Sequence, residues 1–334
     1  MAMRIAIDAM GGDQAPEKII QGAVESLELL DSEDELILVG REEVIQRHIG
    51  AVRQYRAKLR IENAKQVIGM DESPVEAVRH KRDSSIVRMV KLAADGSGDA
   101  IISAGNTGAL VAAGVLLLKP LPGVDRPAIA VSVPTAGGMV LLCDAGANVQ
   151  PKPAHLYQYA WLARIYAESM GHVKNPRVGL LNIGSETEKG TPLVKETRLL
   201  LEQDPSVNYI GYVEGRDFFR GVCDVAITDG FTGNMVLKVI EGLTESLLNV
   251  LGREIRAEKP EVPAEMDRVL ARIQSSYDHE EYGGAVLLGF SGLFLKVHGS
   301  AGAKAIRNAV RRVKEANRLD ISGRIAARLS GGVA

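Results

Sequence analysis

The chain has 334 residues, of which 46% are apolar and 25% are charged, and 40 Lys and Arg nearly balance 42 Asp and Glu for a net charge of −2. This composition is typical of a globular protein, and it excludes a disordered chain, a collagen and a disulfide-stapled miniprotein. Only 4% of the residues are aromatic, which argues against a nucleic-acid surface built by base stacking.

Predicted strands and helices alternate along most of the chain. The predicted strands span residues 3–7, 36–39, 99–103, 128–133, 139–143, 178–182, 207–210, 222–228 and 293–297. The predicted helices span residues 16–30, 41–48, 74–94 with a break, 106–118, 153–170, 191–203 and 231–251, and a basic helix follows the last strand. This alternation predicts an α/β fold.

The strand sequences also predict the kind of sheet. Strands such as 100–102 and 178–181 are continuous apolar runs, which is typical of a mainly parallel sheet covered by helices on both faces. Strands 128–133 and 139–143 flank a short turn, so we expect them to form an antiparallel hairpin. The expected fold is therefore a three-layer α/β/α arrangement with a mixed, mainly parallel sheet, and we expect residues 1–334 to form one unit.

A charge-rich segment, residues 252–281, carries no strand signal. We interpret it as part of a helical hairpin, inserted at about 240–281, that turns at 257–263 and projects from the sheet. Its apolar positions 262, 266, 269, 270 and 273 fit one helical stripe.

Glycine is enriched: it accounts for 35 of the 334 residues, which is about 10%, against about 7% in an average protein. The glycines gather beside Asn, Thr, Ser and Asp in loops that follow predicted strands, at residues 8–13, 103–109, 144–148, 182–191 and 228–234. Glycine lets backbone amides approach a ligand, and ligands of open α/β sheets bind at the carboxyl ends of strands. We expect these loops to converge on one edge of the sheet and to bind an oxyanion or a phosphate.

Common nucleotide and hydrolase motifs are absent from these loops. Residues 189–191 read Lys-Gly-Thr and do not form a phosphate-binding P-loop. No strand is followed by Gly-x-Gly-x-x-Gly, and residues 289–293 do not form a Gly-x-Ser-x-Gly nucleophile elbow.

The cysteines and histidines give no sign of a metal site. Cys143 and Cys223 lie in apolar runs, so we expect buried structural thiols rather than a catalytic Cys–His pair. No Cys-x-x-Cys or His-Glu-x-x-His pattern occurs and the six histidines do not cluster, so we expect no metal and no cofactor. With no recognisable signal peptide and no apolar run longer than 109–118, the sequence predicts a cytoplasmic protein.

Four residues are candidate catalytic groups. Lys189 is the one cation within a Gly-rich loop; it is either a surface lysine or the group that neutralises a phosphate or a developing oxyanion. Asp229 and Asn234 could orient a nucleophile or bind a carbonyl oxygen, although Asp at a strand end is also a common helix cap. His298 is either a capping or core histidine or the best-placed general acid.

The loops, taken in order, resemble those of the bacterial phosphate acyltransferase family. The motifs lie at residues 8–13, 103–109, 144–148, 182–190, 228–234, 282–285 and 298–300, and the resemblance runs from about Arg4 to beyond Arg312. The family forms acyl phosphate from acyl-[acyl carrier protein] and inorganic phosphate at the start of phospholipid synthesis. The resemblance implies the fold of isocitrate and isopropylmalate dehydrogenases, a homodimer, and a protein that associates peripherally with the membrane and feeds a glycerol-3-phosphate acyltransferase.

The resemblance also implies site residues. It places Lys189, Asp229 and Asn234 at catalytic positions, and Asn106 and Thr107 on a phosphate-facing loop. The same motifs contain Gly108, Gly184, Ser185 and Thr232, which we expect to bind substrate. The family's projecting hairpin has an apolar face thought to touch membrane; here the segment is charge-rich, and its stripe could equally pack against a dimer partner.

Residues 296–334 carry nine Lys and Arg but two acidic residues, a net +7, which leaves −9 on residues 1–295. This segment is either a solvated face of terminal helices or a dock for an acidic partner, which would be the acyl carrier protein. Two other functions remain open: a nicotinamide-dependent decarboxylating dehydrogenase of the same fold, and a non-enzymatic scaffold for lipid-synthesis enzymes.

Overall fold

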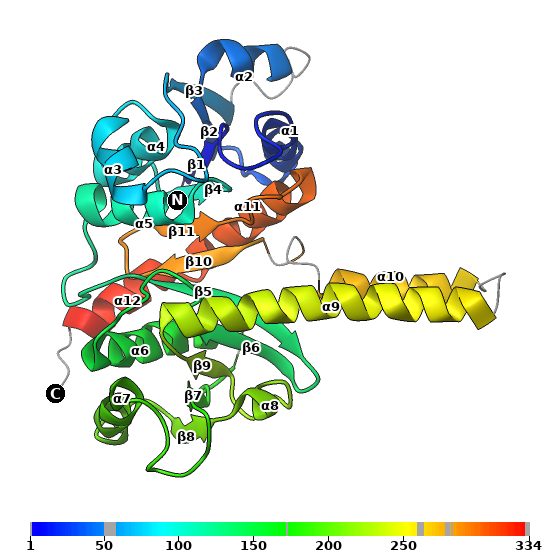
Figure 1. Cartoon of the computed structure of the whole chain (residues 1–334). Helices are drawn as coiled ribbons and strands as arrows, with labels where there is room; N and C mark the ends of the chain where they lie inside the picture. The colour runs from blue at the N-terminus through cyan, green and yellow to red at the C-terminus, as the bar shows by residue number, and fades with distance from the viewer. Residues whose placement is uncertain are drawn as a thin grey trace.

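The computed structural model describes residues 2–49, 58–171, 173–258, 264–277, 281 and 283–330. It shows a layered α/β body from which two long helices, α9 and α10, project together (Figure 1). The strands are β1 (Arg4–Asp8), β2 (Glu35–Gly40), β3 (Leu59–Asn63), β4 (Ala100–Ser103), β5 (Ala128–Thr135), β6 (Gly138–Cys143), β7 (Val178–Leu181), β8 (Tyr209–Val213), β9 (Val225–Ile227), β10 (Ala285–Leu288) and β11 (Leu293–Lys296). The helices are α1 (Glu17–Glu25), α2 (Glu42–Ile49), α3 (Pro74–His80), α4 (Ser85–Ala94), α5 (Thr107–Ala113), α6 (Pro153–Met170), α7 (Pro192–Glu202), α8 (Gly215–Phe218), α9 (Gly230–Glu258), α10 (Ala264–Tyr277), α11 (Ala303–Arg318) and α12 (Ile321–Ser330).

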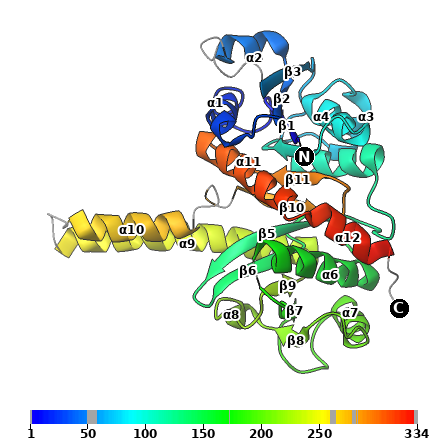
Figure 2. The ribbon, with the colours of Figure 1, turned by 180° about the vertical axis from the view of Figure 1, so that it is seen from behind.

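The described strands form one sheet in the order β3-β2-β1-β4-β11-β10-β5-β6-β9-β7-β8. Helices α1, α6, α11 and α12 lie on one face (Figure 2), and α3, α4, α5 and α9 lie on the other. Ile5 and Ile7 of β1 pack with α1, whereas Ala6 between them packs with α4 and α5. The continuous apolar strands are therefore buried on both faces, and the predicted mixed, mainly parallel α/β sheet is confirmed.

The sheet contains two sets of parallel strands that run in opposite directions. Strands β1–β4 and β11 are parallel to one another, and β6–β9 form a second parallel set. The predicted hairpin of β5 and β6 is confirmed, and β10 is antiparallel to both β11 and β5. Because the carboxyl ends of the two sets point in opposite directions, the glycine loops do not lie along a single edge of the sheet as expected, but loops of both sets meet in one cavity.

The two sets are offset along β5. Strand β10 pairs with Ala128–Ala130, and β6 pairs with Ala130–Thr135. The carboxyl ends of β4 and β11 pair with each other through Ser103 and Lys296, level with the middle of β5. We call this offset between the two strand sets the step in the sheet. Because of it, the loops that follow β4 and β11 lie beside the second half of β5.

Several predicted boundaries move. Strands β3 and β10 were not predicted, β9 is shorter than the predicted 222–228, and β8 lies later than 207–210. Helix α9 is continuous from Gly230 to Glu258, so the predicted 231–251 is too short and the hairpin arises within this helix. Part of the predicted hairpin turn, 259–263, lies outside the described residues.

Candidate active site

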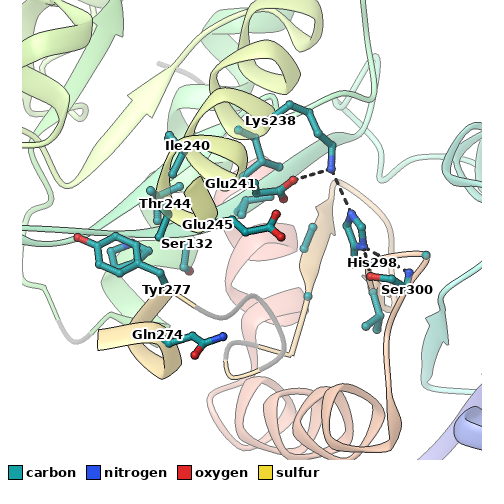
Figure 3. Close-up of a pocket in the computed structure, with 18 of the residues that line it drawn as sticks. Ser132, Lys238, Ile240, Glu241, Thr244, Glu245, Gln274, Tyr277, His298 and Ser300 are labelled. Atoms are coloured by element: carbon teal, nitrogen blue, oxygen red, sulfur yellow. Dashed lines mark hydrogen bonds and ion pairs between the residues drawn. The ribbon is translucent and has the colours of Figure 1, made fainter. Parts of the chain in front are cut away.

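A cavity of about 1290 Å³ lies at the step in the sheet. Its walls are residues 131–134 of β5, the loops after β1, β4, β6 and β11, and one side of α9 and α10. Figure 3 shows Lys238, Ile240, Glu241 and Thr244 of α9 facing this space, with Gln274 and Tyr277 of α10 nearby. The cavity is therefore bounded by both the sheet and the projecting helices.

One end of the cavity is polar and contains a buried lysine. Lys296, the last residue of β11, is 8% exposed and lines the cavity with Asp13, His298 and Ser300. Its Nζ donates hydrogen bonds to the carbonyl oxygens of Ala104, at 3.4 Å, and Val297. Burial lowers the pKa of Lys296 to about 8, because a charged ammonium loses hydration inside the protein.

Lys238 of α9 links this polar end to the helix. Its Nζ lies 2.6 Å from a carboxylate oxygen of Glu241 and 3.1 Å from Nε2 of His298, and Nδ1 of His298 lies 2.8 Å from Oγ of Ser300 (Figure 3). A lysine ammonium can only donate. Nε2 of His298 is therefore the acceptor from Lys238, and Nδ1 lies against both the hydroxyl and, at 3.3 Å, the backbone amide of Ser300.

The other part of the cavity has a mixed lining, in which apolar side chains lie among polar ones such as Glu245, Asn249 and Gln274. Leu237, Ile240 and Leu248 line it from α9, and Leu270 lines it from α10. Val131 and Val133 form the facing wall on β5. A hydrocarbon chain can be buried along this wall at about 25 cal/mol per Å² of apolar surface.

Three predicted site residues line this cavity. Thr107 comes from the loop after β4, His298 from the loop after β11, and Asn234 from the first turns of α9. A Cβ atom added to Gly146, which also lines the cavity, would lie 3.5 Å from Cβ of Asn234. The structure thus brings together residues separated by almost 200 positions of sequence.

Asn106 and Gly108 lie beside the cavity but do not line it. Oδ1 of Asn106 accepts from the amide of Ala109 at 3.0 Å and caps α5, and Nδ2 donates to the carbonyl oxygens of Gly69, Met70 and Glu72. A Cβ atom at Gly108 would lie 2.5 Å from Pro74. Asn106 therefore holds in place the loop that we predicted to face phosphate, and Gly108 allows this loop to pack closely against Pro74.

Lys189, Gly184 and Ser185 lie in the loop between β7 and α7 and do not line the cavity. The side chain of Asn182 holds this loop by donating to the carbonyl oxygens of Gly184 and Lys189. Gly190 has a φ of +95°, and an added Cβ would lie 2.4 Å from Oδ1 of Asn182. This conformation requires glycine, and the catalytic role of Lys189 stays a prediction.

Asp229 and Thr232 lie at the start of α9, also outside the cavity lining. Oδ1 of Asp229 accepts from the backbone amide of Thr232 at 2.9 Å, and Oδ2 accepts from its hydroxyl at 2.7 Å. These are the hydrogen bonds of a helix cap. Asp229 therefore fixes the start of the helix that presents Asn234.

Sequence reasoning missed the functional potential of Lys296 and Lys238. Lys296 was counted with the basic carboxyl-terminal segment, and a lysine directly after the apolar run Leu293–Leu295 is the signal that could have separated it. Asp8, by contrast, is turned into the protein, where it accepts from Ser103 and from the amide of Met10, and burial raises its pKa. Among the described residues, no cluster of three His, Cys, Asp or Glu side chains is suited to a metal ion.

The fold and this cavity define an α/β enzyme whose site combines the buried Lys296 and the exposed Lys238 with apolar side chains. The model of the family described as "Fatty acid synthesis protein" matches residues 3–324. The chain is 45% identical over 323 residues to the phosphate acyltransferase of Bacillus pumilus, with 96% of each chain covered. The chain belongs to this phosphate acyltransferase family and is an acyltransferase.

Solved structures share the fold at low identity. A phosphotransacetylase from Streptococcus pyogenes superposes with a TM-score of 0.61 at 16% identity, covering 99% of this chain and 95% of that one. A Salmonella typhimurium protein to which 4-hydroxythreonine-4-phosphate dehydrogenase activity is attributed superposes with a TM-score of 0.51 at 14% identity, covering 94% and 99%. The fold is thus common to acyl-transferring enzymes and proteins described as dehydrogenases, and it does not by itself specify the reaction.

Proposed function

We propose that the enzyme transfers the acyl group of acyl-[acyl carrier protein] to inorganic phosphate and so supplies acyl phosphate for phospholipid synthesis. The observation that carries this proposal is the cavity with Lys296 and His298 at one end and apolar side chains of α9, α10 and β5 along its length. Such a cavity suits a reaction that joins a phosphate to a hydrocarbon chain. No predicted strand is followed by the Gly-x-Gly-x-x-Gly motif of an ordinary Rossmann dinucleotide site, which disfavours the dehydrogenase alternative.

The proposed reaction is a direct transfer. A phosphate oxygen attacks the thioester carbonyl carbon and forms the new C–O bond, and collapse of the tetrahedral intermediate breaks the C–S bond and releases the thiolate, which takes a proton. The Asn234 side-chain amide donates to the developing oxyanion, and His298 passes on to the thiolate a proton that it receives from the Lys238 ammonium. Positioning is sufficient because thiolate is a good leaving group.

The cysteines support direct transfer over an acyl-enzyme. Cys143 and Cys223 are both buried, as the sequence predicts. Burial raises the pKa of Cys143 well above its ordinary value and that of Cys223 to about 11, so neither thiol is readily ionised. Labelled acyl groups should therefore leave no covalent adduct on the protein after an acid quench, and a stoichiometric adduct detected by mass spectrometry would contradict direct transfer.

We also propose a homodimer through α9. Phe231, Met235, Val239, Leu243 and Leu247 recur every four residues on α9 and are all more than half exposed. An unbroken apolar stripe of this kind is typical of a helix that packs against a partner. Since the same helix lines the cavity on its other side, a second copy would brace the active-site wall.

Peripheral contact with a membrane is proposed for the other projecting helix. Met266, Val269 and Ile273 of α10 are exposed, as an apolar stripe requires, while position 262 lies outside the described residues. Within the described ranges, no helix is long and apolar enough to cross a membrane. Flotation with phospholipid vesicles should weaken in Val269→Glu, and unchanged flotation would assign the stripe to another partner.

The basic carboxyl-terminal segment is largely occupied within the chain. Lys314 pairs with Asp31 and Asp34, Arg307 pairs with Glu28, and Arg312 donates to Tyr166 and Ser132. We propose that the carrier protein contacts its exposed residues, of which Arg311 is one. Arg311→Glu should raise KM for the acyl carrier protein and reduce its salt dependence; unchanged values would place the dock elsewhere.

A further inference from the structure

Lys296 occupies the point where the two strand sets meet. It is the last residue of β11, it pairs with Ser103 at the end of β4 and with Ala285 of β10, and it lines the cavity. Its ammonium is held by the carbonyl oxygens of Ala104 and Val297. The position of this charge is therefore fixed by the sheet rather than by a flexible loop.

The two carbonyl oxygens orient the ammonium but do not neutralise it. Asp8 and Asp13 act on Lys296 through space, and no side-chain carboxylate among the described residues hydrogen-bonds to it. An ammonium has three donors, so the contacts to two carbonyl oxygens leave one for a ligand in the cavity. A buried cation without a paired anion is costly unless a ligand supplies the charge.

The neighbouring groups favour an oxyanion in this place. The charge of Lys238 acts on Lys296, and Lys238 reaches the same end of the cavity through His298. Ser300 and Thr107 add hydroxyl groups to the lining. A dianion would screen the two lysines from each other and accept hydrogen bonds from these donors.

We infer that Lys296 binds the phosphate substrate directly and anchors it at the carboxyl ends of β4 and β11, so that a free phosphate oxygen faces the thioester. This inference rests on the proposed function and adds the residue that supplies the charge. The alternative is a structural lysine that only ties β4 to β11. The two roles differ in their effect on anion affinity.

The first test compares Lys296→Met with Lys91→Met, a matched change at an exposed lysine of α4. Calorimetry with inorganic phosphate should show at least about tenfold weaker binding for Lys296→Met and no change for Lys91→Met, while the melting temperature of Lys296→Met does not fall. A twofold or smaller change in phosphate affinity would overturn the inference. A fall in melting temperature with unchanged affinity would assign the purely structural role.

The second test measures how tightly the unmodified enzyme binds sulfate between about pH 7 and about pH 9.5, a range in which sulfate stays a dianion. Lys296 has a pKa of about 8, so above that pH the free enzyme loses the proton that the anion requires. Sulfate affinity should hold near pH 7 and fall by about tenfold between about pH 7.5 and about pH 9.5. A flat profile over this range would overturn the inference even if Lys296→Met does not fold.

The two proposals can fail separately. If the unmodified enzyme releases thiol only when phosphate is present, but Lys296→Met binds phosphate with unchanged affinity, only the anchor role of Lys296 is wrong. Phosphate binding that depends on Lys296, without any thiol release, would remove the proposed reaction and leave an anion site.

Discussion

Asn234 is the predicted residue whose position in the structure fits its chemistry most directly. It lines the cavity from the first turns of α9, whose start is fixed by the Asp229 cap. Asn234→Ala should lower kcat about 10² to 10³-fold, because the proposed oxyanion donor is removed, with little effect on KM for phosphate. Thiol-release kinetics check this, with Asn317→Ala on the exposed side of α11 as the control; a kcat within threefold of the unmodified enzyme would exclude Asn234.

Lys314 shows what a single charge contributes to stability. Its Nζ lies 2.6 Å from Oδ2 of the buried Asp34 and 2.8 Å from Oδ2 of Asp31, so α11 is tied to the turn before β2. Lys314→Met leaves the Asp34 carboxylate buried without its partner, which should lower the free energy of unfolding by about 3 kcal/mol. Urea denaturation measures this, and adding Asp34→Asn should restore part of the loss; a double variant no more stable than the single would contradict the pairing.

At the residue scale, the sequence predicts which kinds of side chain the site contains better than it predicts where each side chain lies. Thr107, Asn234 and His298 were recognisable from loop motifs, but the similar residues Asn106 and Asn182 support their own loops, so the motif alone does not show which side chain lines the cavity. The burial of Lys296 was not recognisable, because it depends on the pairing of β11 with β4, which are almost 200 residues apart.

Helix α9 serves the cavity with one side and exposes an apolar stripe on another. Thr244 faces the cavity between Ile240 and Leu248. Thr244→Trp should fill this space, so that the rate with long-chain acyl carriers falls by about tenfold while the rate with short-chain acyl carriers is retained. Paired rate measurements check this, with Leu199→Trp on exposed α7 as the control; equal losses for both chain lengths would show that the acyl chain lies elsewhere.

The exposed stripe of the same helix gives a separate prediction. Leu243 is 61% exposed in the single chain, so Leu243→Glu should leave the fold intact and dissociate the proposed dimer by burying a charge at its interface. Sedimentation velocity should show a monomer, whereas Leu199→Glu on α7 should remain a dimer. A dimer that survives Leu243→Glu would place the interface on another element.

At the scale of elements, most strands with both faces buried were predicted, whereas the buried strand β10 and the partly exposed edge strand β3 were missed. Strand β3 has an alternating sequence and lies at the sheet edge with its residues partly exposed, so its signal is weak. Helix α9 was predicted too short because Gly252 and the following charges read as an end, yet the helix continues through them. A projecting helix has few packing contacts to reveal its length in the sequence.

For the whole molecule, the sheet geometry could not be predicted because strand order and offset are tertiary properties. The sequence predicts a mixed sheet, but the opposed strand sets and their step at β5 emerge only from the pairing. That step makes the cavity, because it sets the loops of one strand set against the side of α9 and against the half of β5 that extends beyond its pairing with β10. The site is thus a consequence of the fold rather than of any one motif.

The central claim is that phosphate is the acyl acceptor in this cavity. The direct measurement is thiol release from purified acyl-[acyl carrier protein], with and without inorganic phosphate, with acyl phosphate trapped by hydroxylamine. The account predicts thiol release that depends on phosphate and matches acyl phosphate one for one. Thiol release at the same rate without phosphate, or none with it, would contradict the account.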